Sequence, residues 1–292
     1  GCTNLTSVNL PPDLKAIANS AFESCTKLHE IEIPESVTSI GYSVFRFSGI
    51  RKLHIPDGVS MFDSQLCMFC NELEEVRLPR SLTSIKEQAF YSCSKLSRII
   101  QADGTTDNEA LVLPEGLESI DELAFYGAPF KSIHIPSTLR EIAVTGLASN
   151  TVRTYTIHPE NPAFEVRSNA LIDRSTNILI SGCLESRIDE SVTTIGPKAF
   201  MFCPVTKIDF HEGVTEIQDQ AFLDSHPTEI ISRAPVPPKL GSGCFKVVTY
   251  DGILKVPAGS MQSYIDQWMI DESGYLGNKL LRWKIMAIEE GE

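Results

Sequence analysis

Apolar and polar positions along the chain repeat every 22 or 23 residues. The clearest copy is Leu73–Leu96, which reads L-E-E-V-R-L-P-R-S-L-T-S-I-K-E-Q-A-F-Y-S-C-S-K-L, and related segments begin at Leu28 and Ile50. Self-similarity at a fixed period of this size is the sequence signature of a repeat protein, in which each repeat is one structural unit. The pattern predicts a solenoid of roughly ten coils that is stabilised by contacts between neighbouring coils.

Each coil is predicted to begin with a short strand such as Glu75–Leu78, in which apolar and polar residues alternate. Proline then follows at the same place in six coils, at Pro11, Pro34, Pro56, Pro79, Pro114 and Pro136. Proline lacks an N–H donor and fixes φ, so it ends the strand and turns the chain. We expect a right-handed coil of short parallel strands, each followed by a short helical or 3-10 turn.

One apolar residue marks every coil, four positions before a small–large pair such as Ala89-Phe90. The spacing between successive markers is 23, 22, 23, 35, 22, 53 and 22 residues, and the markers are Ile17, Ile40, Phe62, Ile85, Ile120, Ile142, Ile195 and Ile217. The two long gaps predict insertions. The polar, acidic stretch 101–112 is predicted to be a surface loop, and 151–182 is predicted to contain a hairpin around Arg174–Asn177.

The repeat decays after Phe222, so residues 1–228 are assigned to the repeats and 229–292 to a C-terminal capping region. A capped helix is predicted over Ser260–Met269, with Ser260 as the N-cap and Tyr264 and Trp268 on its apolar face. The last coil of a solenoid exposes an apolar end that needs a cover. We therefore predict one domain over residues 1–292.

The net charge of −13 over 292 residues excludes two classes of partner. Nucleic-acid binding requires clustered Lys and Arg, and anionic membranes attract basic segments. The sequence also has no run of 18 apolar residues, so no insertion into a membrane is predicted for this fragment. Gly1-Cys2 falls in the middle of a repeat, and we expect any signal or anchor segment to lie outside the fragment.

The eight cysteines follow the repeat instead of a disulfide framework. Five of them share one slot, three residues after the small–large pair, namely Cys2, Cys25, Cys70, Cys93 and Cys203. Other coils place Ser48, Ala128, Asn150 or Ser225 in this slot. Exchange with small residues favours a buried ladder of free thiols, and one or two disulfides remain an alternative.

No catalytic or metal-binding constellation is found, so we predict neither an enzyme nor a cofactor. Cys67-Met68-Phe69-Cys70 has CxxC spacing, but both cysteines lie in repeat register and zinc requires four ligands. Asp103, Asp107 and Glu109 fit a solvated acidic loop better than a calcium site, which is left open. His54 and His134 are predicted to lie about three coils apart, roughly 14 Å, which is too far to share a metal.

The remaining candidate is the outward side of the strands, which is predicted to be concave. Its proposed ligand-binding residues are Lys52, His54, Glu75, Arg77, Arg98 and His134. Their charges alternate between neighbouring coils, so a cross-strand charge ladder that only stabilises the sheet is one interpretation. The other is a mixed-charge binding face, because solenoids commonly bind partners on extended strand surfaces.

The repeated string L-x-x-I-x-I-P-x-x-V-T-x-I-G-x-x-A-F-x-x-C resembles the BspA-like leucine-rich repeat, also called the Treponema pallidum type. Leu28–Phe45, Leu73–Cys93 and Val192–Cys203 carry the match, together with Asn161-Pro162 and Phe164 in the long coil. Departures occur at Phe62, Cys67, Gly146-Leu147 and His211.

This resemblance implies a secreted or cell-surface bacterial protein, of a kind found in gut and oral anaerobes, that binds other macromolecules and has no catalytic residues. We therefore expect a protein-interaction module, with adhesion to a host protein or glycan as its function. The alternative is a structural spacer that presents another domain at the cell surface.

Overall fold

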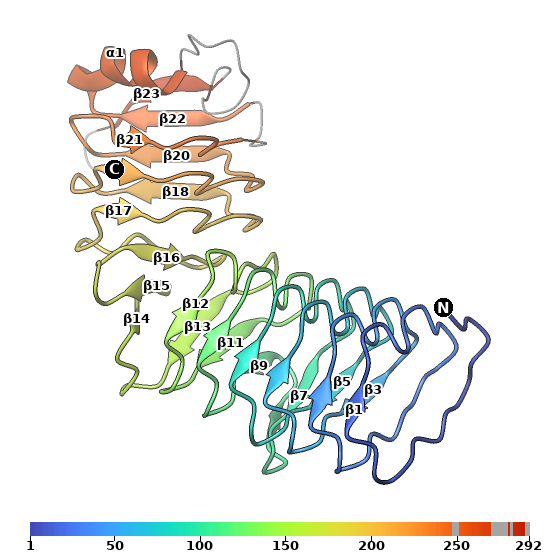
Figure 1. Cartoon of the computed structure of the whole chain (residues 1–292). Coiled ribbons are helices and arrows are strands. Elements are labelled where there is room, and N and C mark those ends of the chain that lie inside the picture. Colours follow the sequence, from blue (N-terminus) through green and yellow to red (C-terminus); the bar gives the residue numbers. More distant parts are fainter. Residues whose placement is uncertain (247–250, 270–279, 281–282, 290–292) are drawn as a thin grey trace. The chain divides into compact units, whose positions relative to one another are not determined.

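The computed structural model describes residues 1–246, 251–269, 280 and 283–289. The rest of the predicted capping region lies outside the described residues. The chain groups into two units, residues 1–163 and 164–292, and each is a stack of coils built from short parallel strands (Figure 1). The predicted solenoid of about ten coils is confirmed. The assignment of both units to one domain stays a prediction.

The predicted first strand of a coil forms from Lys52 onward in unit 1, with an apolar residue inward, whereas the stretches predicted as strands around 7–9 and 30–32 in the first two coils are not strands. These strands pair in parallel in the orders β3-β5-β7 and β9-β11-β13. Their bounds are β3 (Lys52–His54), β5 (Glu75–Arg77), β7 (Arg98–Ile100), β9 (Ala110–Val112), β11 (Ser132–Ile135) and β13 (Thr154–Ile157).

A second strand of two residues follows in each coil and was not predicted. Every such strand ends on the residue that marks the period, and this residue is buried in all but β12, where it is partly buried. Pairing is again parallel, in the groups β1-β2 and β4-β6-β10-β12. The bounds are β1 (Ala16–Ile17), β2 (Ser39–Ile40), β4 (Met61–Phe62), β6 (Ser84–Ile85), β10 (Ser119–Ile120) and β12 (Glu141–Ile142).

The predicted helical or 3-10 segment at the small–large pair is instead an irregular turn. The residue before the pair and a residue shortly after it have left-handed φ angles, as at Gln88 (φ 56°) and Ser92 (φ 57°) on either side of Ala89-Phe90. Two left-handed residues within five positions prevent consecutive helical hydrogen bonds. The turn still presses its ring into the core, where Phe90 is buried between Phe62 and Phe125 at centroid distances of 5.6 and 5.3 Å.

The expectation of a surface loop over 101–112 is wrong at its end. Thr106–Asp107 (β8) pairs antiparallel with β7, and Ala110–Val112 (β9) pairs in parallel with β11. Leu111 is buried and occupies the inward position of an ordinary coil strand. The stretch therefore supplies one additional strand to the stack.

Unit 2 begins with the predicted hairpin. Ala170–Asp173 (β15) pairs antiparallel with Leu179–Ser181 (β16) across the turn at 174–177, and a preceding strand, Phe164–Arg167 (β14), pairs antiparallel with β15. Short parallel strands then continue this sheet, namely β17 (Thr194–Ile195), β19 (Glu216–Ile217) and β21 (Lys239–Leu240). A second parallel sheet runs β18 (Lys207–Phe210), β20 (Glu229–Ser232), β22 (Ile253–Val256) and β23 (Lys284–Ala287).

The apolar core of unit 2 ends in the predicted helical segment. This segment consists of a 3-10 turn, Ala258–Ser260 (η1), an α-helical turn, Met261–Tyr264 (α1), and a π-helical turn, Ile265–Met269 (η2). Tyr264 and Trp268 are buried, as predicted. Ser260 is the N-cap residue of α1, as predicted, but its hydroxyl donates to the Pro235 carbonyl (2.6 Å) and makes no capping bond.

All eight cysteines are free thiols, and seven are buried. Cys2 is the exception to the predicted buried ladder, since it lies exposed in the first coil. Several buried thiols donate to main-chain carbonyls of the neighbouring coil, as from Cys70 to Phe45 (2.8 Å) and from Cys93 to Cys67 (3.1 Å). They tie the coils together without covalent bonds.

Candidate functional site

The six predicted site residues lie on β3, β5, β7 and β11 of unit 1. We call the outward side of the strands of unit 1 the strand face. Parallel pairing aligns Lys52 with Glu75 and Glu75 with Arg98, while His54 aligns with Arg77 in the neighbouring row. The fold thus brings five of the six residues together on three adjacent strands.

The sixth residue, His134, is separated from this group. Ile100 aligns with Arg77, and Val112 of the additional strand aligns with His134, so two apolar positions intervene along the row. The predicted separation of three coils between His54 and His134 is wrong because β9 adds another. His134 is engaged locally, with its Nδ1 2.9 Å from the Thr156 hydroxyl.

Two of the residues form the charge ladder that the sequence left as an alternative. Arg98 Nη1 lies 2.6 Å from Glu75 Oε2, with the Glu75 side chain 18% exposed and the Arg98 side chain 44% exposed. Lys52, His54 and Arg77 are exposed and form no ion pair within the described part of the chain. Arg77 reaches only the Ala102 carbonyl, at 3.5 Å. These three side chains remain available to a ligand.

The acidic stretch beside this face uses its carboxylates to hold turns. Asp103 Oδ1 accepts hydrogen bonds from the N–H and hydroxyl of Thr105, and these bonds lower the pKa of Asp103. Asp107 Oδ1 accepts from the N–H groups of Glu109 and Ala110. Within the described ranges, no three His, Cys, Asp or Glu side chains are grouped to hold a metal ion.

The CxxC cysteines face the core of unit 1. Burial raises the pKa of Cys67 well above the ordinary value, whereas hydrogen bonds with Cys67 and Ser48 together outweigh burial and lower the pKa of Cys70. Both thiols are shielded from solvent, and no further ligands that would complete a zinc site are grouped with them among the described residues. The arrangement of these cysteines is that of packing residues.

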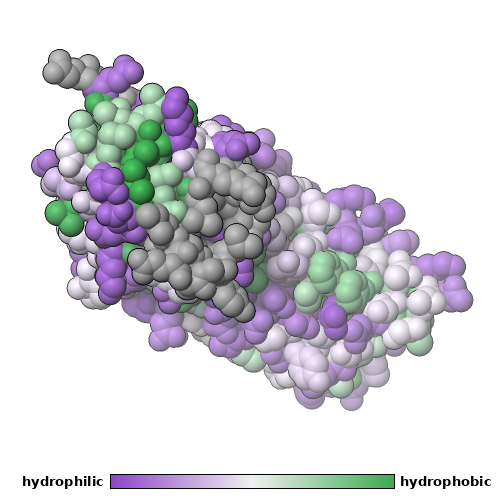
Figure 2. All heavy atoms as spheres, turned by 90° about the horizontal axis from the view of Figure 1, so that it is seen from above, coloured by the Kyte–Doolittle hydropathy of each residue, from purple (hydrophilic) through white to green (hydrophobic). Residues whose placement is uncertain are grey.

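A strip of aromatic side chains on the turns of unit 1 escaped the sequence analysis. Phe47 stacks on Phe69 (4.9 Å), Phe69 meets Tyr91 edge-on (5.5 Å), and Tyr91 lies 5.4 Å from Tyr126. Phe47 is 40% exposed, and a hydrophobic patch is visible on the hydrophilic surface of this unit, at the right of Figure 2. The available signal was an aromatic residue one or two positions after the small–large pair in four successive coils.

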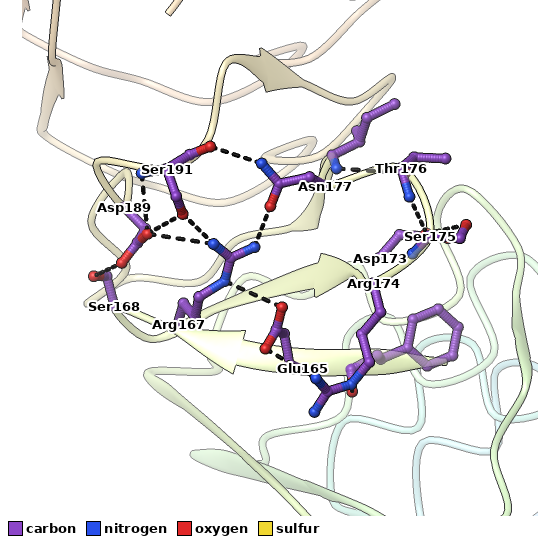
Figure 3. Close-up of polar contacts among 12 residues, drawn as sticks. Glu165, Arg167, Ser168, Asp173, Arg174, Ser175, Thr176, Asn177, Asp189 and Ser191 are labelled. Atoms are coloured by element: carbon purple, nitrogen blue, oxygen red, sulfur yellow. Dashed lines mark hydrogen bonds and ion pairs between the residues drawn. The ribbon is translucent and has the colours of Figure 1, made fainter. Parts of the chain in front are cut away.

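A polar network in unit 2 surrounds Arg167 at the end of β14 (Figure 3). Its guanidinium donates to Ser191 and Asn177 and lies 3.3 Å from Glu165 and 3.5 Å from Asp189. Hydrogen bonds from the Ser191 hydroxyl and N–H lower the pKa of Asp189. Because these groups satisfy one another across the hairpin and the next coil, the network is a structural tie.

Residues 1–274 are matched in overlapping segments by one protein family. The family model, described as the BspA type leucine rich repeat region, matches in six copies over residues 1–109, 103–225 and 181–274. The chain therefore belongs to this family of repeat proteins. Its described helices are all too short and too polar to cross a bilayer. No curated protein sequence matches the chain.

Solved bacterial structures share the fold. A leucine-rich repeat protein from Eubacterium ventriosum is 18% identical with a TM-score of 0.55, over 75% of this chain and 65% of that chain. The pneumococcal vaccine antigen PcpA is 17% identical with a TM-score of 0.54, over 85% of this chain and 69% of that one. The chain thus spans just under two thirds of the Eubacterium protein.

Proposed function

We propose that this chain is a non-enzymatic interaction module of a secreted or cell-surface bacterial protein, and that its strand face binds a host protein or glycan. The observation that carries the proposal is the group Lys52, His54 and Arg77, exposed on adjacent strands and unused by the charge ladder. Family membership and the likeness to a vaccine antigen support a location outside the cell.

The ligand chemistry follows from this surface. Lys52 and His54 are the outward residues of β3, and Arg77 is the outward residue at the end of β5. These side chains supply hydrogen-bond donors above the buried apolar residues Leu53 and Val76. Donors in this arrangement suit carboxylates on a protein surface or on acidic sugars, and Arg binds them in a bidentate manner. Because the chain as a whole carries a net charge of −13, an acidic ligand is directed to this local cationic group and not to the rest of the surface.

The test is binding of the purified chain to immobilised extracellular-matrix proteins and sialylated glycans. We expect micromolar binding that Arg77→Glu weakens at least about tenfold, corresponding to about 1.4 kcal/mol. Arg98→Glu reverses the same charge, but at a residue that is already paired with Glu75 in the charge ladder.

The matched control is Arg80→Glu, which makes the same change of charge in the turn after Pro79, where Arg80 lies 3.4 Å from Asp57. It should leave binding unchanged. If the parent chain binds none of these surfaces, or if Arg80→Glu and Arg77→Glu weaken binding equally, the strand face is not the site. The structural spacer would then be the better account of the protein.

A further inference from the structure

The parallel sheet of unit 2 has an unpaired edge at β18, beside a cavity. Elsewhere, the residue that begins a coil strand donates its N–H to the equivalent carbonyl of the preceding coil. Such bonds join Arg51 to His29, Glu74 to Arg51, Ser97 to Glu74, Lys131 to Glu109, Arg153 to Lys131 and Thr228 to Thr206, at 2.7 to 3.2 Å. The equivalent N–H at β18 is that of Thr206, and within the described residues it has no such partner.

The preceding coil explains why the Thr206 N–H lacks this bond. Its segment Leu184–Ile188 places the two apolar residues four positions apart, where intact coils place them three apart, as at Leu73 and Val76. The segment forms no strand, and the Arg187 N–H donates to the Ser168 carbonyl of the hairpin instead (2.9 Å). A cavity of about 860 Å³ lies between this segment and β18.

The backbone of β18 presents hydrogen-bonding groups to this cavity. Thr206 and Phe210 use their carbonyls to accept from Glu229 and Arg233 of the β20 side. Backbone groups of successive strand residues point to opposite edges, so Ile208 also faces β20 while Lys207 and Asp209 face away from it. The N–H and C=O groups of Lys207 and Asp209 therefore form a template for another strand.

The cavity walls repeat the two-sided character of a coil. Phe200, Val205 and Ile208 line its inner side and are buried apolar residues. Lys207 and Asp209 line its outer side with opposite charges, and each is also paired on the β20 side, Lys207 with Glu229 at 3.3 Å and Asp209 with Arg233 at 2.8 Å. A strand placed here would direct alternate side chains toward an apolar floor and toward a charged rim.

We propose that the β18 edge captures an extended peptide segment of a partner protein by adding it as a parallel strand. The segment carries apolar residues at alternate positions, an acidic residue opposite Lys207 and a basic residue opposite Asp209. Main-chain bonds to Lys207 and Asp209 supply affinity, and the apolar floor and charged rim supply specificity. This proposal is independent of the strand face of unit 1.

The probe is a fluorescein-labelled peptide that copies residues 73–78, L-E-E-V-R-L, from an intact coil. In repeat register Glu75 falls opposite Lys207 and Arg77 opposite Asp209, while Leu73, Val76 and Leu78 face inward. We expect saturable binding to the full chain by fluorescence anisotropy. A peptide with the two charges exchanged should bind at least about fivefold more weakly, since like charges would then be opposed.

Two variants test the backbone contribution at the same position. Asp209→Ala removes the carboxylate but keeps the outward N–H, whereas Asp209→Pro also removes this N–H without taking a bond from β20. We expect Asp209→Pro to bind the peptide at least about tenfold more weakly than Asp209→Ala. Circular dichroism and the urea midpoint establish that both variants are folded.

Lys207→Glu supplies a test that does not depend on proline. It should abolish the preference between the two peptides, because each peptide would then meet one opposite and one like charge. No binding up to about 1 mM peptide, equal affinity of folded Asp209→Pro and Asp209→Ala, or an undiminished preference between the two peptides in Lys207→Glu would overturn the proposal. Self-association of the chain that Asp209→Pro abolishes in sedimentation velocity would assign the edge to a second copy and would equally overturn it.

Discussion

Single side chains at fixed slots join each coil to the one before it. Ser36 donates to the carbonyls of Pro12 and Leu14 (2.8 and 2.7 Å), two positions after the strand-ending proline. Thr138 and Asn161 make related bonds to the preceding turn. The carbonyls at the corner of a coil have no strand partner, so a hydroxyl or amide at this slot satisfies groups that would otherwise lose water on stacking.

Ser81 provides the sharpest test of this role. Its hydroxyl lies 2.6 Å from the Asp57 carbonyl and 2.9 Å from the Val59 carbonyl. Ser81→Ala removes both contacts, and we expect the free energy of unfolding to fall by about 1–2 kcal/mol in urea titrations. Ser94→Ala, at an exposed turn position later in the same coil, should change it by less than about 0.5 kcal/mol. Equal effects of the two substitutions would contradict a structural role for the slot.

The reactivity of each thiol is also set by the burial of the single residue that carries it. Burial raises the pKa of Cys203 and of Cys244 to about 12, so both remain protonated at neutral pH. We expect an aromatic disulfide reagent to modify one thiol per native chain, Cys2, and all eight in denaturant. Cys2→Ser should abolish the native reaction. Fast modification of three or more thiols in the native chain would show that the cysteine ladder is open to solvent.

Strands that follow a long periodic pattern could be predicted from the sequence, whereas two-residue strands could not. The first strand of each coil is readable because three inward apolar positions precede a proline, as at Leu73, Val76 and Leu78 before Pro79. The second strand has two residues, which is too short to carry a period. The hairpin β15–β16 was predicted from two alternating runs around a polar turn.

Other elements depend on geometry that composition does not encode. The turn between β14 and β15 uses left-handed Ser168 and Asn169 (φ 47° and 61°) without the glycine that usually announces such a turn. The strand β9 was read as loop because the polar stretch 101–109 that precedes it obscures its one buried residue, Leu111. On the candidate site, the alignment of Lys52, Glu75 and Arg98 follows from the repeat, but the β18 edge follows from hydrogen bonds that only the structure shows.

The helical cap of unit 2 should respond to alkaline pH. Burial raises the pKa of Tyr264 to about 12, and its hydroxyl donates to the Ala234 carbonyl (2.9 Å) and lies 2.6 Å from Ser232. A folded pKa above the unfolded value means that the unfolded chain ionises first. The stabilisation is therefore complete below about pH 10 and is lost as pH rises toward about 12.

Cys203 and Cys244 add to this loss from about pH 9. We expect the free energy of unfolding, measured in urea, to fall steadily over this range. Tyr264→Phe should begin less stable but lose stability less steeply above about pH 10. Identical slopes for the parent and Tyr264→Phe would show that the phenol does not titrate on unfolding.

At the scale of the whole molecule, stability is the sum of interfaces between neighbouring coils. Rings from successive coils meet in each unit, as at Phe90 and Phe125 (5.3 Å) in unit 1 and at Phe200 and Phe222 (5.0 Å) in unit 2. No coil buries its apolar face alone, so loss of one ring weakens the interfaces on both of its sides. Unfolding should then spread along the array from any damaged coil.

Matched substitutions in the two units test how far this spreading reaches. Phe90→Ala and Phe222→Ala each remove a fully buried ring, and each should cost about 3–5 kcal/mol. We propose that residues 1–292 unfold as one domain, so both variants should lower the midpoint of a single calorimetric transition. Two transitions, of which Phe90→Ala lowers one and Phe222→Ala lowers the other, would assign residues 1–163 and 164–292 to separate domains, because the coupling between coils would then fail at that boundary.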